Sequence, residues 1–474
     1  MTATMNPPAS QGNLALRLKS AISTAQTIQR PNSSPSPSIS LAAASSITKL
    51  DPEQQRAVDM MQAGGNIFLS GMAGTGKSTA LLEFIGQSFR AVDVCATTGI
   101  AALNLQDQFR RRAGVALPAH TVYRWSGIGL GPAAGQTHQQ YWDFLNLGRM
   151  PMSRMAAFRR VARSECLVID EISMLPGRVL DYLNFHFQQI RGNSAPFGGI
   201  QIIAVGDFLQ LPPVAKSGKY DWAFFAQSWA AARLQPAYLT TIHRQDEPIF
   251  VEALNNFREG RISRSVADVL SSRVKMFVDR RVVRLMTHNA QVDKWNSYQI
   301  GEIDAPELTY NAEFEGPEHE ADFIAKNSIT PTKLILKRGA RVMVTSNLTG
   351  EGGELIAVNG QCGTVMEMGG ESVAVALDGG ATVQINRRSW TYDPQRDDSA
   401  AMHQIPLRPA YALTIHKSQG LTLDRAHIDI RAAREPGQAY VALSRLRSLS
   451  GLFLKEWIKG VHVSDAAINF YRNL

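Results

Sequence analysis

The chain is poor in cysteine: it has three among 474 residues, and Cys95, Cys166 and Cys362 stand far apart. None belongs to a C-x-x-C pair or lies beside a histidine cluster, so neither a disulfide scaffold nor a structural zinc site is expected. Long hydrophobic runs are missing as well, because no stretch of 18 apolar residues occurs. This absence excludes a membrane-spanning helix from the expected elements, and we expect no membrane partner.

Acidic residues are absent from the first 50 positions, which contain four basic residues, Arg17, Lys19, Arg30 and Lys49. This tail therefore supplies half of the formal net charge of +8, and charge alone is a weak sign of a nucleic-acid partner. Residues 1–49, rich in Ser, Pro and Ala, predict a disordered tail. An acid-free, Arg-bearing start is also typical of a mitochondrial transit peptide. Two locations stay open: first the bacterial cytoplasm, at the nucleoid, and second the mitochondrial matrix.

After residue 50, apolar runs of strand length alternate with stretches of helix length. The first set of these runs is 66–70, 91–97, 166–169 and 199–205, and the second is 282–287, 341–345 and 425–430. This alternation predicts α/β domains built on parallel sheets. Residues 358–408 differ, because short strands with turns are expected there, at 363–367, 372–377 and 382–385. We interpret this stretch as a small β-barrel inserted into the second α/β domain.

A phosphate-binding loop follows the first strand-like run. Residues 71–78 match G-x-x-x-x-G-K-[ST] in full and precede a helical stretch, which is the context that this motif requires. Its backbone N–H groups and the following helix N-terminus favour phosphate. Lys77 is expected on the β- and γ-phosphates and Ser78 on Mg²⁺. The residues predicted to hold ATP are Gly71, Ala73, Gly74, Thr75, Gly76, Lys77, Ser78 and Thr79.

Two carboxylates end a neighbouring strand. The apolar run 166–169 is followed directly by Asp170 and Glu171. Asp170 is placed to reach Mg²⁺, and Glu171 is the candidate general base for the attacking water. A surface Asp-Glu pair that caps the next helix is the alternative. With the phosphate-binding loop, this pattern predicts nucleotide hydrolysis with ATP and Mg²⁺.

The string Gly206-Asp207-Phe208-Leu209-Gln210-Leu211-Pro212-Pro213-Val214 comes after this acidic strand. Together with residues 170–174 (DEISM) and 196–201 (PFGGIQ), it resembles the Pif-type DNA helicases of superfamily 1B, related to the RecD- and Dda-like 5′-to-3′ helicases. The resemblance continues to about residue 453. It implies Gln210 as the amide that senses the γ-phosphate.

Three further strings match motifs of this family that bind the nucleotide. Residues 50–54 (LDPEQ) resemble the adenine-contacting Q motif, which implies Gln54 on the base; Asp51 stands where the family usually has Ser or Thr, and Asp also caps helices. The strings IHRQ at 242–245 and QAYVALSR at 438–445 imply Arg244 and Arg445 as γ-phosphate contacts. Guanidinium suits this role because it stays charged and donates from a planar fork.

The same resemblance implies contacts with single-stranded DNA. Residues 96–102 resemble motif Ia, which places Thr98 and Gly99 on the strand backbone. The segment 121–125 implies contacts from Thr121, Tyr123 and Arg124, although Tyr123 and Arg124 replace the family's His and Ser. Aromatic stacking and an arginine on phosphate would still suit single-stranded DNA. Trp125, in the same segment, either stacks on a base or packs in the core.

The string YALTIHKSQG at 411–420 matches motif V almost completely. It implies two groups of contacts, with the nucleotide from Gln419 and Gly420, and with DNA from Thr414, His416, Lys417 and Ser418. Contacts with the DNA backbone bind strongly but do not distinguish sequences.

The family resemblance also implies the architecture, an α/β fold with two RecA-like P-loop domains. The first, domain 1A, is expected at 50–238 with a small wedge insertion at about 105–160. The second, domain 2A, is expected at 239–357 and 409–474, with an SH3-like β-barrel, domain 2B, at 358–408.

The implied activity is that of an ATP-dependent 5′-to-3′ DNA helicase that translocates on single-stranded DNA and unwinds forked or tailed duplexes. The expected setting is genome maintenance: replication, recombination, repair or telomere maintenance, as a monomer with replication or repair partners. Two alternatives remain, a DNA-stimulated ATPase switch such as a loader, and a RecD-like subunit that acts only within a larger complex. The intact strings at 411–420 and 438–445 favour the motor. A switch does not need both contacts that hold the DNA strand and residues that couple these contacts to ATP hydrolysis.

Overall fold

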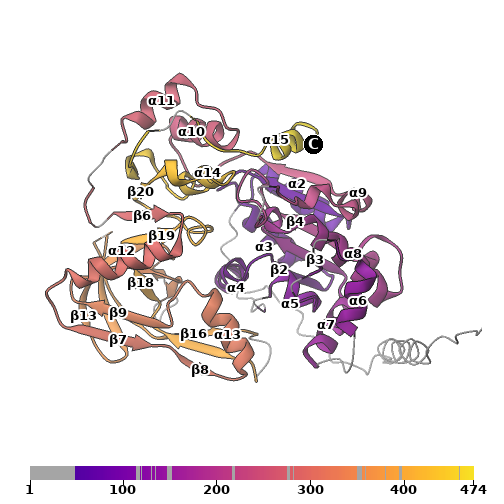
Figure 1. The fold of residues 1–474 in the computed structure, drawn as a ribbon, viewed down its shortest axis with the longest axis horizontal. Helices are drawn as coiled ribbons and strands as arrows, with labels where there is room; N and C mark the ends of the chain where they lie inside the picture. The colour runs from indigo at the N-terminus through magenta and orange to yellow at the C-terminus, as the bar shows by residue number, and fades with distance from the viewer. Residues whose placement is uncertain are drawn as a thin grey trace, which may run out of the picture.

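The computed structural model describes residues 49–474, except 114–117, 119, 130, 134, 147–151, 216–218, 275–277, 281, 350–354, 358, 379, 394–397 and 458–459. The tail predicted at 1–49 lies outside the described residues except for its last position. Two α/β bodies lie side by side, and a β-rich body is attached to the second (Figure 1). Within the described ranges, no helix is both long and apolar enough to cross a membrane.

A parallel sheet of five strands forms the first domain, in the order β2-β3-β4-β1-β5. The strands are β1 (Ile67–Gly71), β2 (Val92–Ala96), β3 (Cys166–Asp170), β4 (Gln201–Val205) and β5 (Gln235–Leu239). All four strand-like runs predicted for this half of the chain are confirmed. The interior strands are buried on both faces, as apolar runs in a parallel sheet require.

Helices cover both faces of this sheet. They are α2 (Pro52–Gln62), α3 (Lys77–Gln87), α4 (Gly99–Ala113), α8 (Gly177–Arg191) and α9 (Gln227–Ala232), with the short 3₁₀ turns η1 (Ile172–Met174), η2 (Pro196–Gly199) and η3 (Ala223–Phe225). Asp51 caps α2 as expected, because its side chain accepts hydrogen bonds from the N–H groups of Glu53 and Gln54.

Between α4 and β3 the described residues form three further helices, α5 (Val122–Ser126), α6 (His138–Asn146) and α7 (Met152–Arg163). They fall in the region predicted to hold a wedge. Their buried faces, which include Trp125, Trp142 and Val161, join the core cluster that contains α8. Trp125 is therefore a core residue, 1% exposed, as one of the two readings of the sequence predicted.

The second domain is built on a parallel sheet of four strands in the order β19-β6-β20-β21. Its strands are β6 (Val283–Met286), β19 (Ala412–Thr414), β20 (Ala426–Ile428) and β21 (Leu452–Leu454). The accompanying helices are α10 (Pro248–Arg258), α11 (Arg264–Ser271), α12 (Asn289–Gly301) and α14 (Gln438–Leu443), with η4 (Ile430–Ala432) and η5 (Leu449–Gly451).

An antiparallel sheet with its own apolar core forms the attached body, in the order β15-β14-β13-β10-β18. Its strands are β10 (Arg341–Val344), β13 (Cys362–Met368), β14 (Ser372–Leu377), β15 (Thr382–Asn386) and β18 (Leu407–Pro409). The three short strands predicted within 358–408 are confirmed. The run 341–345 was expected in the parallel set, and this expectation is wrong, because β10 pairs antiparallel with β13 and β18. A short buried apolar run does not reveal its sheet.

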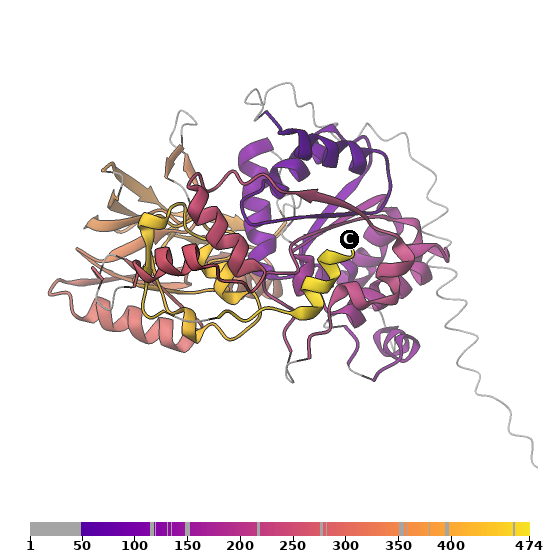
Figure 2. The same cartoon turned by 90° about the horizontal axis from the view of Figure 1, so that it is seen from above.

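Smaller elements complete this body. They are β7 (Glu307–Asn311), β8 (Glu313–Glu315), β9 (Lys333–Lys337), β11 (Leu348–Thr349), β12 (Leu355–Ala357), β16 (Arg388–Thr391), β17 (Ala401–Gln404) and helix α13 (Glu318–Asn327). The last helix of the chain, α15 (Asp465–Arg472), returns to the first domain and lies against it in both views (Figures 1 and 2). Ala467 of α15 is buried in the core cluster of the first domain.

Candidate active site

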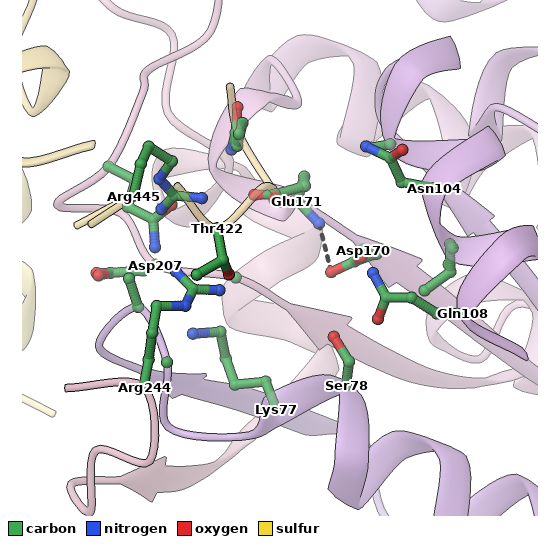
Figure 3. A pocket seen from close by; sticks show the side chains of 18 of the residues that line it. Lys77, Ser78, Asn104, Gln108, Asp170, Glu171, Asp207, Arg244, Thr422 and Arg445 are labelled. Atoms are coloured by element: carbon green, nitrogen blue, oxygen red, sulfur yellow. Dashed lines mark hydrogen bonds between the residues drawn. The ribbon is translucent and has the colours of Figure 1, made fainter. Parts of the chain in front are cut away.

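A cavity of about 700 Å³ lies between the two α/β domains and collects most of the residues predicted to act on the nucleotide. The lining residues that the sequence predicted for this purpose are Ala73, Gly74, Gly76, Lys77, Ser78, Thr79, Asp170, Glu171, Gln210, Arg244, Gln419, Gly420 and Arg445. In the close-up, Arg244 and Arg445 lie opposite Ser78 and Asp170 (Figure 3). The cavity therefore joins the phosphate-binding loop of one domain to the arginines of the other.

The phosphate-binding loop links β1 to α3 in a tight path. Gly76 has a φ of 82°, a left-handed conformation that favours glycine, and a Cβ atom there would lie 2.2 Å from Nε2 of Gln54. Lys77 donates hydrogen bonds through Nζ to the carbonyl oxygens of Gly71 (2.8 Å) and Met72 (2.9 Å). Burial lowers the pKa of Lys77, against the raising effect of nearby carboxylates such as Asp207. The ammonium group is thus held at the mouth of the loop, where phosphate would meet it.

Glu171 has a strained backbone next to Asp170. Its φ of 54° is left-handed, a conformation rare for a non-glycine residue that concentrates at functional sites. Its N–H donates to Oδ1 of Asp170 (2.9 Å), and its carbonyl accepts from Oγ1 of Thr97 (2.9 Å). Although Glu171 precedes η1, its side chain makes no cap hydrogen bond within the described chain. The capping alternative is therefore wrong for Glu171.

Burial and the neighbouring Asp170 raise the pKa of Glu171 to about 7, against the lowering effect of Lys77 and Arg445. A general base must be ionised to accept a proton, so activity is expected to rise with pH through this pKa. We therefore expect kcat/KM for ATP, which reports groups of the free enzyme, to fall about tenfold per pH unit below about 7. Steady-state ATP hydrolysis at saturating single-stranded DNA, followed between pH 5.5 and 8.5, measures this pH dependence of kcat/KM. A profile flat across this range would contradict the assignment.

Both arginines come from the second domain and share one anchor, Ser444. Nη1 of Arg244 donates to the carbonyl oxygen of Ser444 (3.0 Å), and Nη2 of Arg445 donates to its hydroxyl (2.8 Å). Nε of Arg445 also donates to the carbonyl of Val441 (2.9 Å), which fixes the guanidinium against α14. Burial lowers the pKa of Arg445, and the nearby Arg244 lowers it further. Two close positive groups of this kind are suited to bind a polyanion.

The phosphate-binding loop touches the second domain directly. The N–H of Ala73 donates to the hydroxyl of Tyr440 (2.9 Å), and the N–H of His243 donates to the carbonyl of Gly74 (2.9 Å). A Cβ atom on Gly74 would lie 2.7 Å from Cβ of Arg244, so the glycine allows this approach. The contribution of Tyr440 was not predicted, although it lies within the matched string 438–445. The backbone of the loop is thus hydrogen-bonded to residues that follow β5 and to α14 of the second domain.

Gln54 lies behind the loop and is not among the lining residues. It is 4% exposed, and its Nε2 donates to the carbonyl oxygen of Thr75 (3.1 Å) while its Oε1 accepts from the N–H of Asp51 (3.2 Å). Thr75 is also buried, with its hydroxyl donating to the carbonyl of Met72 (2.9 Å). The structure therefore gives Gln54 a supporting position, and its contact with adenine stays a prediction.

The oxygen groups of Ser78 and Asp170 fit a magnesium site. Both residues line the cavity, and in Figure 3 the Ser78 hydroxyl and the Asp170 carboxylate point into the same region. In the described part of the chain, no cluster of three His, Cys, Asp or Glu side chains could hold a metal by itself. Mg²⁺ is commonly held by one or two protein oxygens together with substrate phosphates, which matches this pair.

The residues predicted to bind DNA fall into two groups. Thr98 and His416 line the cavity. Thr414 and Ser418 are buried, and their hydroxyls stabilise the local turn: Thr414 accepts from the N–H of Lys417 (3.2 Å), and Ser418 donates to the carbonyl of Ile415 (2.8 Å). The side chains of His416 and Lys417 in this turn are half-buried, and of these two His416 lines the cavity.

The segment 121–125 makes contacts between the domains. Thr121 caps α5, accepting from the N–H of Arg124 (3.3 Å), and Tyr123 is half-buried against the core. The guanidinium of Arg124 lies 3.9 Å from the ring centroid of Tyr392 and 3.6 Å from the carboxylate of Glu320. Gly99 is covered by Asn327 of α13, because a Cβ atom there would lie 2.0 Å from the Asn327 Oδ1. DNA contacts from these positions stay predictions.

Several polar lining residues had no signal in the sequence. Asn104 and Gln108 come from α4, Thr422 comes from the second domain, and Asn347 and Asn359 lie next to β11 and β12 of the attached body. They belong to no motif, and only the packing of these bodies against one another brings them to the cavity. Asp207 also lines it, and although it stands inside the quoted string 206–214, sequence reasoning gave it no role.

Comparisons with known proteins agree with this geometry. A family described as an AAA domain matches residues 49–279. The ATP-dependent DNA helicase Pif1 of Bdellovibrio bacteriovorus is 35% identical over 428 residues, covering 90% of this chain and 92% of that protein. The structure of Bacteroides sp. Pif1 with ADP-AlF4 matches with a TM-score of 0.73 at 30% identity, over 90% of this chain and 97% of that one. Bacteroides Pif1 bound to single-stranded DNA, with the same identity and coverage, gives 0.59. The chain therefore belongs to the Pif-type helicases of superfamily 1B and is an ATP-hydrolysing DNA helicase.

Proposed function

We propose that the protein moves 5′ to 3′ along single-stranded DNA and unwinds forked or tailed duplex DNA ahead of it. It works as a monomer. Ser78 and Asp170 would hold Mg²⁺, and the ion would screen the phosphate charge. The setting is genome maintenance, in replication, recombination, repair or telomere maintenance, at the nucleoid of a bacterial cytoplasm. One observation carries the proposal: the cavity joins Lys77 and Glu171 of one domain to Arg244 and Arg445 of the other.

The mechanism starts from this division of the site between domains. Lys77 and the loop N–H groups bind the phosphates, and Gln210 contacts the γ-phosphate beside them. Arg244 and Arg445 approach from the second domain, so nucleotide binding closes the cleft and hydrolysis, with Glu171 taking the proton of the attacking water, lets it open. Each cycle changes the distance between the two domains.

The link to DNA runs through the segment 411–420. His416, Gln419 and Gly420 line the cavity, and Lys417 follows His416 directly. Closure therefore shifts a segment that touches both the nucleotide cavity and the proposed strand path. In the same way, Thr98 lines the cavity at the N-terminus of α4. Alternate gripping by these two segments produces inchworm movement along the strand.

Polarity and motor activity are tested together by strand displacement with ATP and Mg²⁺. Two partial duplexes of matched sequence are compared, one with a 5′ single-stranded tail and one with a 3′ tail. We expect unwinding of the 5′-tailed substrate only. Unwinding of the 3′-tailed substrate alone would overturn the polarity, and DNA-stimulated hydrolysis without any unwinding would favour the switch or the partner-dependent subunit.

A further inference from the structure

Asp207 is the most deeply buried carboxylate at the cavity, with its side chain 0% exposed. It pairs with Arg258 of α10 through two hydrogen bonds, Nε to Oδ2 (3.0 Å) and Nη2 to Oδ1 (2.9 Å). Burial alone would raise the pKa of Asp207, but the Arg258 guanidinium outweighs it and holds the pKa below its usual value. Asp207 is thus ionised and held in a fixed orientation from the second domain.

A second group, from the far end of the chain, meets the same carboxylate. The hydroxyl of Tyr471 on α15 lies 3.2 Å from Oδ1 of Asp207, 2.7 Å from Oγ of Ser70 and 3.1 Å from the backbone nitrogen of Phe208. A phenol has one proton, and the carboxylate needs it. Tyr471 therefore donates to Asp207 and accepts from Ser70 and from the N–H of Phe208. These three bonds tie the end of β1 to the loop that starts at Asp207.

Aromatic packing holds Tyr471 in place. Its neighbour Phe470 stacks on Phe224 with ring centroids 4.6 Å apart, and it lies 5.2 Å from Phe208 and 5.8 Å from Phe68. The guanidinium of Arg258 lies 5.0 Å from the Tyr471 ring. Helix α15 is therefore anchored on the first domain independently of the hydroxyl contacts, and a change of the hydroxyl alone leaves the anchor intact.

The loop held in this way leads directly to Gln210. The N–H of Leu209 donates to Oδ1 of Asp207 (3.1 Å), and the N–H of Gln210 donates to the backbone carbonyl of Asp207 (3.0 Å). Gln210 then lines the cavity. On its other side Gly437 packs so closely that a Cβ atom there would lie 2.3 Å from the carbonyl oxygen of Gln210. The position of the Gln210 amide thus depends on Asp207.

We propose that Tyr471 is a positioning residue for ATP hydrolysis: its hydroxyl orients Asp207 so that the turn 207–210 presents Gln210 to the γ-phosphate. The inference rests on the proposed role of Gln210. It assigns the last helix of the chain to the motor site, although that helix does not line the cavity. The hydroxyl acts only through Asp207 and Gln210, so its effect requires an intact Gln210 side chain.

The test is the variant Tyr471→Phe, which keeps the ring and removes the hydroxyl. A hydrogen bond to a charged group contributes enough that kcat for DNA-stimulated ATP hydrolysis should fall about tenfold. We expect KM for ATP and the Kd for single-stranded DNA to stay unchanged, and Tm to fall only slightly, because the hydroxyl contacts are lost but the aromatic anchor remains. Asn469→Ala is the matched control, an exposed change on the same helix, and it should leave kcat as in the unmodified protein.

A double-mutant cycle separates positioning from simple folding support. In a Gln210→Ala background, Tyr471→Phe should have no further effect on kcat, because the two side chains act in series. Three results would each overturn the proposal. The first is a loss of kcat in the double variant equal to the combined losses of the two single variants. The second is a large fall in Tm of Tyr471→Phe together with a smaller fraction of molecules that bind nucleotide, and the third is an unchanged kcat in Tyr471→Phe. If Gln210→Ala alone hydrolyses ATP normally, the proposed role of Gln210 at the γ-phosphate is wrong. This result is distinct from the results above, which would overturn only the positioning role of Tyr471.

Discussion

Replacement of Glu171 by glutamine is expected to abolish unwinding and to lower kcat for ATP hydrolysis by about 10²- to 10⁴-fold, the usual contribution of a general base. Glutamine keeps the size of the side chain but cannot accept the proton of the attacking water. The phosphate-binding loop and Lys77 are untouched, so ATP binding should persist. Single-stranded DNA binding should persist too, since Glu171 points into the nucleotide cavity (Figure 3).

Strand displacement, single-turnover hydrolysis and fluorescence anisotropy with labelled DNA measure these three properties. Glu165→Gln is the matched control, because Glu165 precedes the same strand at its other end and accepts a hydrogen bond from the N–H of Ala91, which glutamine can also accept. Lys77→Ala should also abolish unwinding, but through weaker binding of ATP. Normal strand displacement by Glu171→Gln would refute its role as the base.

Local patterns were sufficient to predict which motif residues of the first domain come together at the cavity, while their roles stay predictions. The glycines and Lys77 of the phosphate-binding loop, and the carboxylates at the end of β3, follow from neighbours within a few residues. A parallel sheet brings the carboxyl ends of its strands to one edge, so β1 and β3 deliver these groups to the same place. The roles of Arg244 and Arg445 were predicted only from the resemblance of residues 242–245 and 438–445 to family motifs, because the residues around each arginine do not by themselves indicate a phosphate contact.

Contacts that depend on distant segments could not be predicted. Tyr440 meets Ala73 across 367 residues, and Tyr471 meets Asp207 across 264. The local sequence around a tyrosine or an arginine on an amphipathic helix is the same whether the side chain packs in a core or orients a catalytic loop. Arg124 likewise contacts Tyr392 and Glu320, which no local pattern indicated, while its predicted contact with DNA stays a prediction. Only the arrangement of the two domains decides such cases.

Replacement of Arg445 by alanine is expected to lower kcat for ATP hydrolysis by about 10³-fold or more, as for other arginines that stabilise a phosphoryl-transfer transition state. Its guanidinium lies in the cavity, held to α14 through Val441 and Ser444. Because it comes from the second domain, the proposed mechanism gives it a further role, the coupling of hydrolysis to closure. We therefore expect unwinding to be lost while ATP still binds to the loop of the first domain.

Arg445→Lys should be almost as inactive as Arg445→Ala, and this comparison separates charge from geometry. Lysine keeps the positive charge but lacks the planar fork that reaches the carbonyl of Val441 and the hydroxyl of Ser444 together while facing phosphate. Arg431→Ala, which removes an exposed arginine paired with Glu456, is the control and should leave kcat unchanged. Stopped-flow phosphate release measures all three variants. Recovery of hydrolysis in the lysine variant would show that charge alone is sufficient, and the assignment of Arg445 as a geometric contact to the γ-phosphate would then be wrong.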